Sequence, residues 1–187
     1  MIETGELRKG STIEIDGTLY QVIEVEHIKI GRGSAQVRMK LRDVRAGHIV
    51  DKSVQAGARF TRARVERQAA QYLYEEGGLL YFMNTDTYDQ FPLGRDKLGD
   101  AMDYLTENAT CNLLMYGDEP VGIELPAAVE LAVTETDPGM RGDTAQGGTK
   151  PAKLQTGISV NVPLFITVGD AVKVDTRSGE YLERVSK

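Results

Sequence analysis

The stretch Ile28-Lys29-Ile30-Gly31-Arg32-Gly33-Ser34-Ala35 places one arginine between two glycines, and it separates two segments with the pattern of β-strands. Residues 19–25 are rich in β-branched and aromatic side chains, and residues 35–41 alternate apolar and polar side chains. The pattern predicts a β-hairpin with Arg32 at its tip. Both glycines can adopt positive φ, so the loop can turn tightly and extend the arginine away from the sheet.

Further basic residues surround the predicted tip. Between residues 29 and 45 the chain has a single carboxylate, Asp43, against six cations: Lys29, Arg32, Arg38, Lys40, Arg42 and Arg45. For an isolated Gly-x-Gly, the ordinary interpretation of a solvated arginine on a turn stays open. The clustered charge favours a basic arm that contacts a polyanion.

Charge is distributed unevenly along the chain, whose net charge is −6. Residues 1–64 hold 12 Lys and Arg against 8 Asp and Glu, residues 65–126 hold 3 against 12, and residues 127–187 hold 7 against 8. Only the first third has the charge expected of a polyanion binder. The acidic middle third would be repelled by phosphate, so it either serves solubility or faces a basic protein partner.

Short strands separated by turn residues account for most of the remaining sequence. Asp16-Gly17 predicts a two-residue hairpin, and residues 71–83 predict a second one that turns at residues 75–78. Further strands are expected over residues 110–122 and from Val129. One exception is a short amphipathic helix predicted after Pro92 and Gly94. Its core-facing side chains would be Leu98, Met102 and Leu105, and its outward acidic face would consist of Asp96, Asp100 and Asp103.

The composition changes near Val65 and Pro126, which divides the chain into residues 1–64, 65–126 and 127–187. Each piece has roughly the smallest size that can fold around one core. All three have an all-β pattern, so we predict three small β-barrel domains in an elongated arrangement. That shape suits the bridging of distant points on a large partner better than the enclosure of a small substrate.

Several classes of protein find no support in the sequence. Cys111 is the only cysteine, so an internal disulfide is excluded, and we expect a buried thiol. No P-loop, histidine–carboxylate cluster or nucleophile elbow is present, so we expect no enzyme, catalytic residue, metal or cofactor. The first residues lack the apolar core of a signal peptide and no apolar run could span a bilayer, so a cytoplasmic location without membrane contact is expected.

A polar, glycine-rich loop is predicted over residues 137–153. It offers Arg141, Lys150 and Lys153, together with glycine amides that can approach phosphate closely. A simple linker remains the alternative. Arg141-Gly142-Asp143 also spells an adhesion tripeptide, which we interpret as a coincidence in a chain without an export signal.

Over its whole length the sequence resembles bacterial elongation factor P. The similarity is carried by residues 82–91, by residues 173–182, by Arg141-Gly142-Asp143-Thr144, and by a carboxy-terminal signature spaced as Lys150-Pro151-Ala152, Gly157, Val162-Pro163, Ile166 and Gly169. The segment from Gly31 to Ala35 falls on the functional hairpin of that family.

The resemblance implies an SH3-like (KOW-type) barrel followed by two OB-fold barrels. It also implies a monomeric translation elongation factor that binds the 70S ribosome between the P and E sites, positions peptidyl-tRNA and relieves stalling at consecutive prolines. Its partners would be both ribosomal subunits, rRNA, P-site peptidyl-tRNA and the exit-site stalk protein. The alternatives are an elongation-factor-P-like paralogue and a general RNA-binding or assembly module of the same folds.

The same resemblance assigns roles to individual residues. Arg32 would contact the acceptor end of the tRNA, supported by Lys29, Gly31, Gly33 and Ser34, with RNA-backbone contacts from Arg38, Lys40 and Arg42. The third domain would contribute a loop, Arg141, Gly142, Asp143, Thr144 and Lys150, and a small-subunit contact, Tyr181 and Arg184. Many family members carry a lysine at the tip that receives a β-lysyl group; Arg32 excludes lysylation but leaves rhamnosylation open. Ile30 stands where many members have proline.

Overall fold

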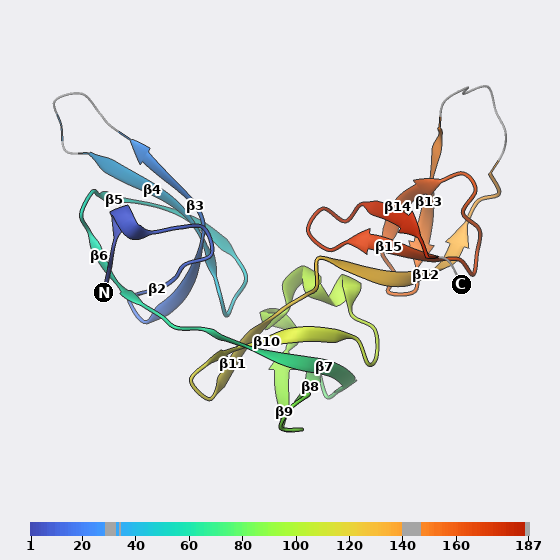
Figure 1. Ribbon diagram of the computed structural model, residues 1–187, viewed down its shortest axis with the longest axis horizontal. Coiled ribbons are helices and arrows are strands. Elements are labelled where there is room, and N and C mark those ends of the chain that lie inside the picture. Colours follow the sequence, from blue (N-terminus) through green and yellow to red (C-terminus); the bar gives the residue numbers. More distant parts are fainter. Residues whose placement is uncertain (29–32, 34, 140–146, 186–187) are drawn as a thin grey trace.

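The computed structural model describes residues 1–28, 33, 35–139 and 147–185 of the chain (Figure 1). The described strands form three antiparallel sheets that follow one another along the sequence, over residues 2–62, 66–124 and 128–184. Figure 1 shows the first domain on the left, the middle domain at the bottom and the third on the right, so the molecule is elongated and bent. The predicted all-β class with three barrel domains is confirmed. No helix in the described ranges is long and apolar enough to cross a membrane.

The first sheet has the strand order β1-β6-β2-β3-β4-β5. Its elements are β1 (Ile2–Glu3), η1 (Thr4–Glu6), β2 (Thr12–Ile15), β3 (Thr18–Ile28), β4 (Gln36–Asp43), β5 (Ile49–Gln55) and β6 (Arg59–Arg62). The Asp16-Gly17 hairpin is confirmed, because both residues have positive φ, 51° and 78°, as a tight two-residue turn requires. The long hairpin is confirmed too: Ile28 pairs with Gln36 at the end of the β3–β4 ladder.

The second sheet has the order β11-β10-β7-β8-β9, and contacts between β9 and β11 bring its edges together into a barrel. It consists of β7 (Glu66–Glu76), β8 (Leu79–Asn84), β9 (Gln90–Gly94), β10 (Thr110–Tyr116) and β11 (Glu119–Glu124). The second predicted hairpin is present, and the alternating face of β10 buries Cys111, Leu113 and Met115 as expected. Burial raises the pKa of the Cys111 thiol to about 11.

The predicted amphipathic helix begins after Gly94 as expected but is wrong in type. Pro92 and Gly94 lie inside β9, and the helical part consists of two short 3-10 helices, η2 (Arg95–Lys97) and η3 (Gly99–Tyr104). Leu98 separates them, and η3 begins at Gly99, whose φ of 51° few non-glycine residues adopt. The packing inference still holds: Leu98 and Leu105 are buried and Met102 packs against the same core, with the three aspartates exposed.

The third sheet has the order β14-β13-β12-β15-β16. Its strands are β12 (Ala128–Thr136), β13 (Thr149–Leu154), β14 (Ser159–Pro163), β15 (Ala171–Asp175) and β16 (Tyr181–Arg184). The loop predicted over residues 137–153 therefore ends earlier, because Thr149 starts β13. Alternate residues of that strand, Lys150, Ala152 and Leu154, are buried, so the period of two continues through a segment whose polar composition resembles a loop.

Within the described residues, packed side chains join the domains at two places. At the first, the buried Leu19, Ala63 and Val121 form one cluster that takes residues from the first and middle domains, and Arg45 Nη2 lies 2.9 Å from Glu119 Oε2 beside it. At the second, Tyr104 of η3 packs against the core of the third domain. The middle domain therefore holds the two outer domains through different elements.

Candidate nucleic-acid interface

The strand β4 carries the predicted RNA-backbone contacts on one face. Its burial alternates strictly, so Val37, Met39 and Leu41 are buried while Arg38, Lys40 and Arg42 are exposed. Alternate residues of a strand lie about 6.7 Å apart, which is close to the spacing of phosphates along an RNA strand. The structure thus brings these three cations together in a row on the outer face of the hairpin.

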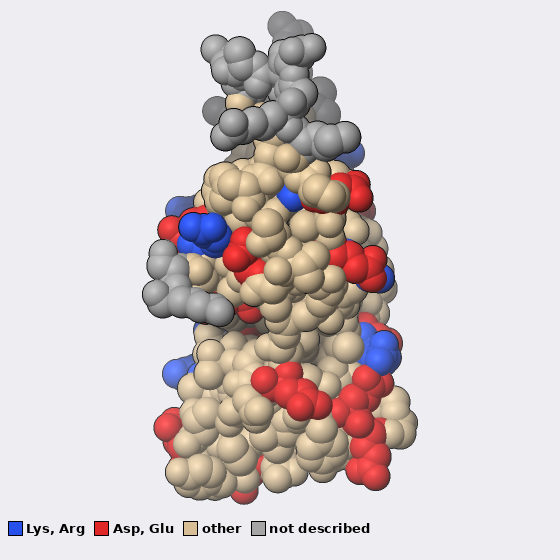
Figure 2. Space-filling view, turned by 90° about the vertical axis from the view of Figure 1, so that its right-hand side faces the viewer, with Lys and Arg blue, Asp and Glu red and all other residues tan. Residues whose placement is uncertain are grey.

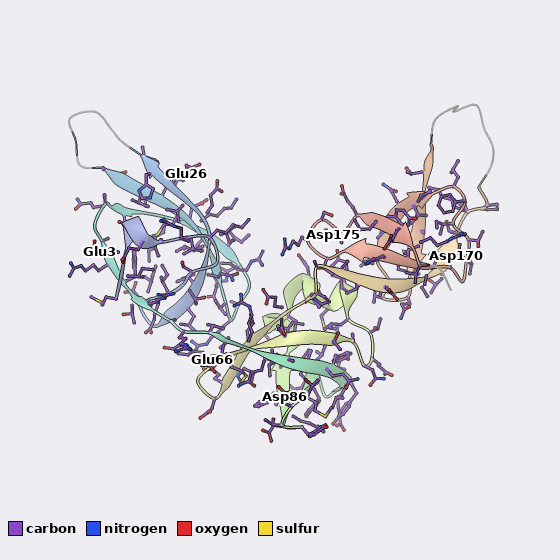
Figure 3. All side chains as sticks on the ribbon, in the orientation of Figure 1. Glu3, Glu26, Glu66, Asp86, Asp170 and Asp175 are labelled. Carbon is purple, nitrogen blue, oxygen red and sulfur yellow. The ribbon has the colours of Figure 1, made fainter. Side chains whose placement is uncertain are left out.

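Carboxylates lie beside these cations, which sequence reasoning missed. Glu26 pairs with Arg38 across the β3–β4 ladder, and Lys40 lies between Glu24 of β3 and Asp51 of β5. Figure 3 shows Glu26 on the hairpin of the first domain. Cross-strand partners share one face of a sheet, so the surface carries mixed charge rather than a purely basic stripe. A bulge between Val22 and Glu24 sets this register, and no local sequence signal locates it.

Asp43 and Arg45, at the end of the basic stretch, have structural tasks. The Asp43 carboxylate accepts hydrogen bonds from the backbone amides of Arg45 and Ala46, both at 2.8 Å, and closes the turn after β4. The Arg45 side chain donates to Glu119 of the middle domain. Neither side chain therefore contributes to the outer face of β4, and Arg45 belongs to the domain junction.

The tip lies largely outside the described residues. Arg32, Lys29, Gly31 and Ser34 are not among them, and Gly33 is described as an exposed residue. The β3 and β4 strand ends that lead to this loop point away from the middle domain (Figure 1). The end of β12 and the start of β13 also lie far from the middle domain, on the opposite arm (Figure 1).

The third-domain loop residues Arg141, Gly142, Asp143 and Thr144 likewise lie outside the described residues. Lys150 is described, and its position does not match a solvent-facing loop contact. Its side chain is 6% exposed, and the Nζ donates a hydrogen bond to the carbonyl oxygen of Asp137 at 2.5 Å. The ammonium group thus ties the start of β13 to the chain that leaves β12.

The predicted small-subunit contacts lie together on β16. Tyr181 is half-buried and packs against the core of the third domain. Arg184 is exposed, and its guanidinium carbon lies 5.5 Å from the centre of the Phe165 ring. Phe165 is itself 59% exposed, so the pair forms a cation–π contact at the surface. Sequence reasoning did not single out Phe165.

The described residues contain no group of three or more histidine, cysteine or acidic side chains that could hold a metal. The exposed outer face of β4 offers charged donors and acceptors, which is chemistry suited to binding.

Three family models match the chain in succession. The elongation factor P KOW-like domain matches residues 3–60, the elongation factor P OB domain residues 65–123, and the elongation factor P C-terminal region residues 129–184. Elongation factor P of Moorella thermoacetica is 51% identical over 184 residues, which cover 98% of this chain and 100% of that protein. Elongation factor P of Carboxydothermus hydrogenoformans is 49% identical over 185 residues, 99% and 100% of the two chains.

Among solved structures, eukaryotic translation initiation factor 5A from Methanococcus jannaschii aligns with a TM-score of 0.48 and 18% identity, over 67% of this chain and 92% of that one. The assignment rests on the sequence matches. The chain has a KOW-like barrel, an OB barrel and a third small β-domain, and its relatives are named elongation factor P. These findings define a translation elongation factor. The chain belongs to the elongation factor P family, and the resemblance seen in the sequence is confirmed.

Proposed function

We propose that this protein binds the ribosome between the P and E sites, contacts the acceptor end of peptidyl-tRNA through Arg32, and relieves stalling at consecutive prolines. The observation that carries the proposal is the succession of all three family domains in one chain, with Arg32 in the loop between β3 and β4. The elongated fold supports it, because the outer domains can contact points that lie far apart (Figure 1).

The mechanism needs no catalytic side chain. Proline is a constrained nucleophile, so a stalled peptidyl-tRNA spends little time in a reactive arrangement. A factor that holds the acceptor end in place lowers the entropic part of the barrier. Arginine suits this task because its planar guanidinium stays charged and presents forked donors to phosphate or ribose oxygens.

The outer face of β4 would guide the approach to RNA. Arg38, Lys40 and Arg42 can each contact a phosphate, and the neighbouring carboxylates reduce non-specific affinity for other RNA. The third domain would reach the small subunit through residues 141–144 and Arg184. The acidic middle domain would face a basic protein, which in the proposed location is the exit-site stalk protein.

We also propose that Arg32 acts either bare or with a rhamnose on its guanidinium, and that it never carries a β-lysyl group, since it has no amine to acylate. The mass of the protein purified from its own source tests this: an added deoxyhexose identifies the sugar, and the unmodified mass identifies a bare arginine.

The function itself is tested by the rate of Pro-Pro-Pro peptide synthesis on purified ribosomes, with and without the recombinant protein. A message that lacks consecutive prolines serves as the control. We expect acceleration of the proline message only. Equal rates with and without protein, for both the recombinant and the native form, would contradict the proposal.

A further inference from the structure

The outer face of the middle sheet has two apolar areas, and the first domain covers one of them. On β10 and β11, Leu114 and Val121 pack in the cluster that contains Leu19 and Ala63 of the first domain. On β7, β8 and β9, a second group of apolar side chains is exposed or partly exposed to solvent. We define this aromatic stripe as Tyr74, Leu79, Tyr81, Met83 and Pro92.

The register of the strands brings the stripe together. Tyr74 of β7 pairs with Tyr81 of β8, which pairs with Pro92 of β9, and cross-strand partners lie on one face. The rings of Tyr74 and Tyr81 stack with their centroids 4.9 Å apart and their planes at 21°. Tyr74 is 42% exposed and Leu79 is 39% exposed, so the described structure leaves a preformed aromatic surface in water.

The middle domain that carries the stripe is acidic, with 3 Lys and Arg against 12 Asp and Glu over residues 65–126. Two of the three cations of the middle domain are already paired, Arg67 with Glu124 at 2.7 Å and Arg95 with Glu75 at 2.5 Å. In the described part of the chain, no ion pair is found for Glu76 or Asp86, which flank the stripe, nor for five carboxylates elsewhere on the domain: Asp96, Asp100, Asp103, Glu107 and Asp118. In the lower half of Figure 2, red side chains predominate over blue ones.

One of these carboxylates belongs to the stripe by register. Glu76 pairs with Leu79, so it lies at the end of the stripe on the same face. Asp86 lies in the turn between β8 and β9, at the opposite end of the two strands (Figure 3). A ligand lying along the stripe would therefore meet negative charge at both ends.

These features select one kind of partner. RNA phosphates would be repelled by the uncompensated carboxylates, and a second copy of this chain would bring two acidic surfaces together. An arginine side chain fits both properties of the surface, because its guanidinium stacks on aromatic rings and pairs with carboxylates.

We propose that the aromatic stripe binds an arginine- and lysine-rich segment of a partner protein. The inference rests on the proposed function in one respect, since a ribosomal protein would supply that segment. The contact itself is tested without ribosomes, so its failure is distinguishable from failure of the proposed function.

The test is a titration of the ¹⁵N-labelled full chain with a synthetic peptide of six Arg-Gly repeats, followed by NMR. A Glu-Gly peptide of the same length and a 12-nucleotide oligo-uridine are the comparison ligands. We expect the arginine peptide to shift the amide signals of residues 71–83 and 90–92. Tyr74→Ala should weaken its binding about 2–5-fold, whereas Tyr74→Phe, which keeps the ring, should bind as the parent does.

Two matched variants separate a specific contact from general attraction. Phe165→Ala removes a ring of the third domain that is more exposed than Tyr74, 59% against 42%, and it should leave the affinity unchanged. Glu76→Gln should weaken binding of the arginine peptide, whereas Glu107→Gln, elsewhere on the domain, should not. These two variants still test the contact if Tyr74→Ala fails to fold. The proposal is overturned if both variants of each pair bind the arginine peptide equally weakly. Tighter binding of oligo-uridine than of the arginine peptide, or dimerisation through the stripe in sedimentation experiments, would overturn it as well.

Discussion

Replacement of Leu19 by alanine should loosen the junction between the first and middle domains. Leu19 is 1% exposed, and its side chain belongs to the cluster with Ala63 and Val121 rather than to the core cluster of the first domain. The substitution removes three carbons, which at about 0.8 kcal/mol per buried methylene corresponds to about 2.4 kcal/mol. Buried leucine-to-alanine changes cost about 2–5 kcal/mol, and we expect the lower end because a junction can partly close around the space.

The neighbouring ion pair cannot compensate for this loss. Arg45 and Glu119 are both partly exposed, and such pairs contribute about 0–1 kcal/mol. The free energy of unfolding is measured by urea denaturation, and the interdomain geometry by small-angle X-ray scattering. Leu131→Ala, an equally buried change in the third-domain core, is the control. We expect both variants to lose stability but only Leu19→Ala to broaden the distance distribution; unchanged scattering for that variant would refute the reasoning.

Three further predictions concern single side chains. Asn84→Ala removes three hydrogen bonds of 2.8–3.1 Å: two that Asn84 accepts from the backbone of the β8–β9 turn and one that it donates to Gln68 of β7. It should lower the free energy of unfolding by about 2–3 kcal/mol in urea denaturation. Because burial raises the pKa of Cys111 from 9.0 to about 11, the stabilisation from burying the neutral thiol is present below pH 9 and is lost as the pH rises to about 11. At pH 8 the thiol of the native protein should also react with a thiol reagent far more slowly than that of the urea-unfolded protein. Gly179→Ala should cost more than Gly47→Ala in thermal unfolding, although both glycines have φ near 75°, because only at Gly179 would the new Cβ lie 3.1 Å from the hydroxyl of Tyr104.

The sequence predicted those features of the fold that depend on local patterns. Period-two alternation identified β4 and β10, and Asp16-Gly17 identified a hairpin, because these signals act between neighbouring residues. The helix after Pro92 was predicted wrongly, since its apolar spacing fits both an α-helix and two 3-10 turns. Lys150 was placed in a loop because composition cannot show that a lysine will be buried against a distant carbonyl.

For the candidate site, the sequence identified the cations of β4 but not their acidic neighbours. Glu24 and Asp51 lie far from Lys40 along the chain, and they share its face only because of strand pairing and a bulge in β3. The stripe around Tyr74 and Tyr81 has the same origin. Long-range register decides which side chains share a surface, so neither feature could be read from linear spacing.

The most direct test of the account is single-turnover Pro-Pro-Pro synthesis with three forms of the protein: the parent, Arg32→Ala and Arg64→Ala. Arg64 is a matched control because its side chain is 90% exposed and lies outside the predicted site. We predict that the parent and Arg64→Ala accelerate synthesis equally, and that Arg32→Ala loses most of the acceleration with unchanged thermal unfolding. Full acceleration by Arg32→Ala would contradict the claim that the tip arginine positions the tRNA.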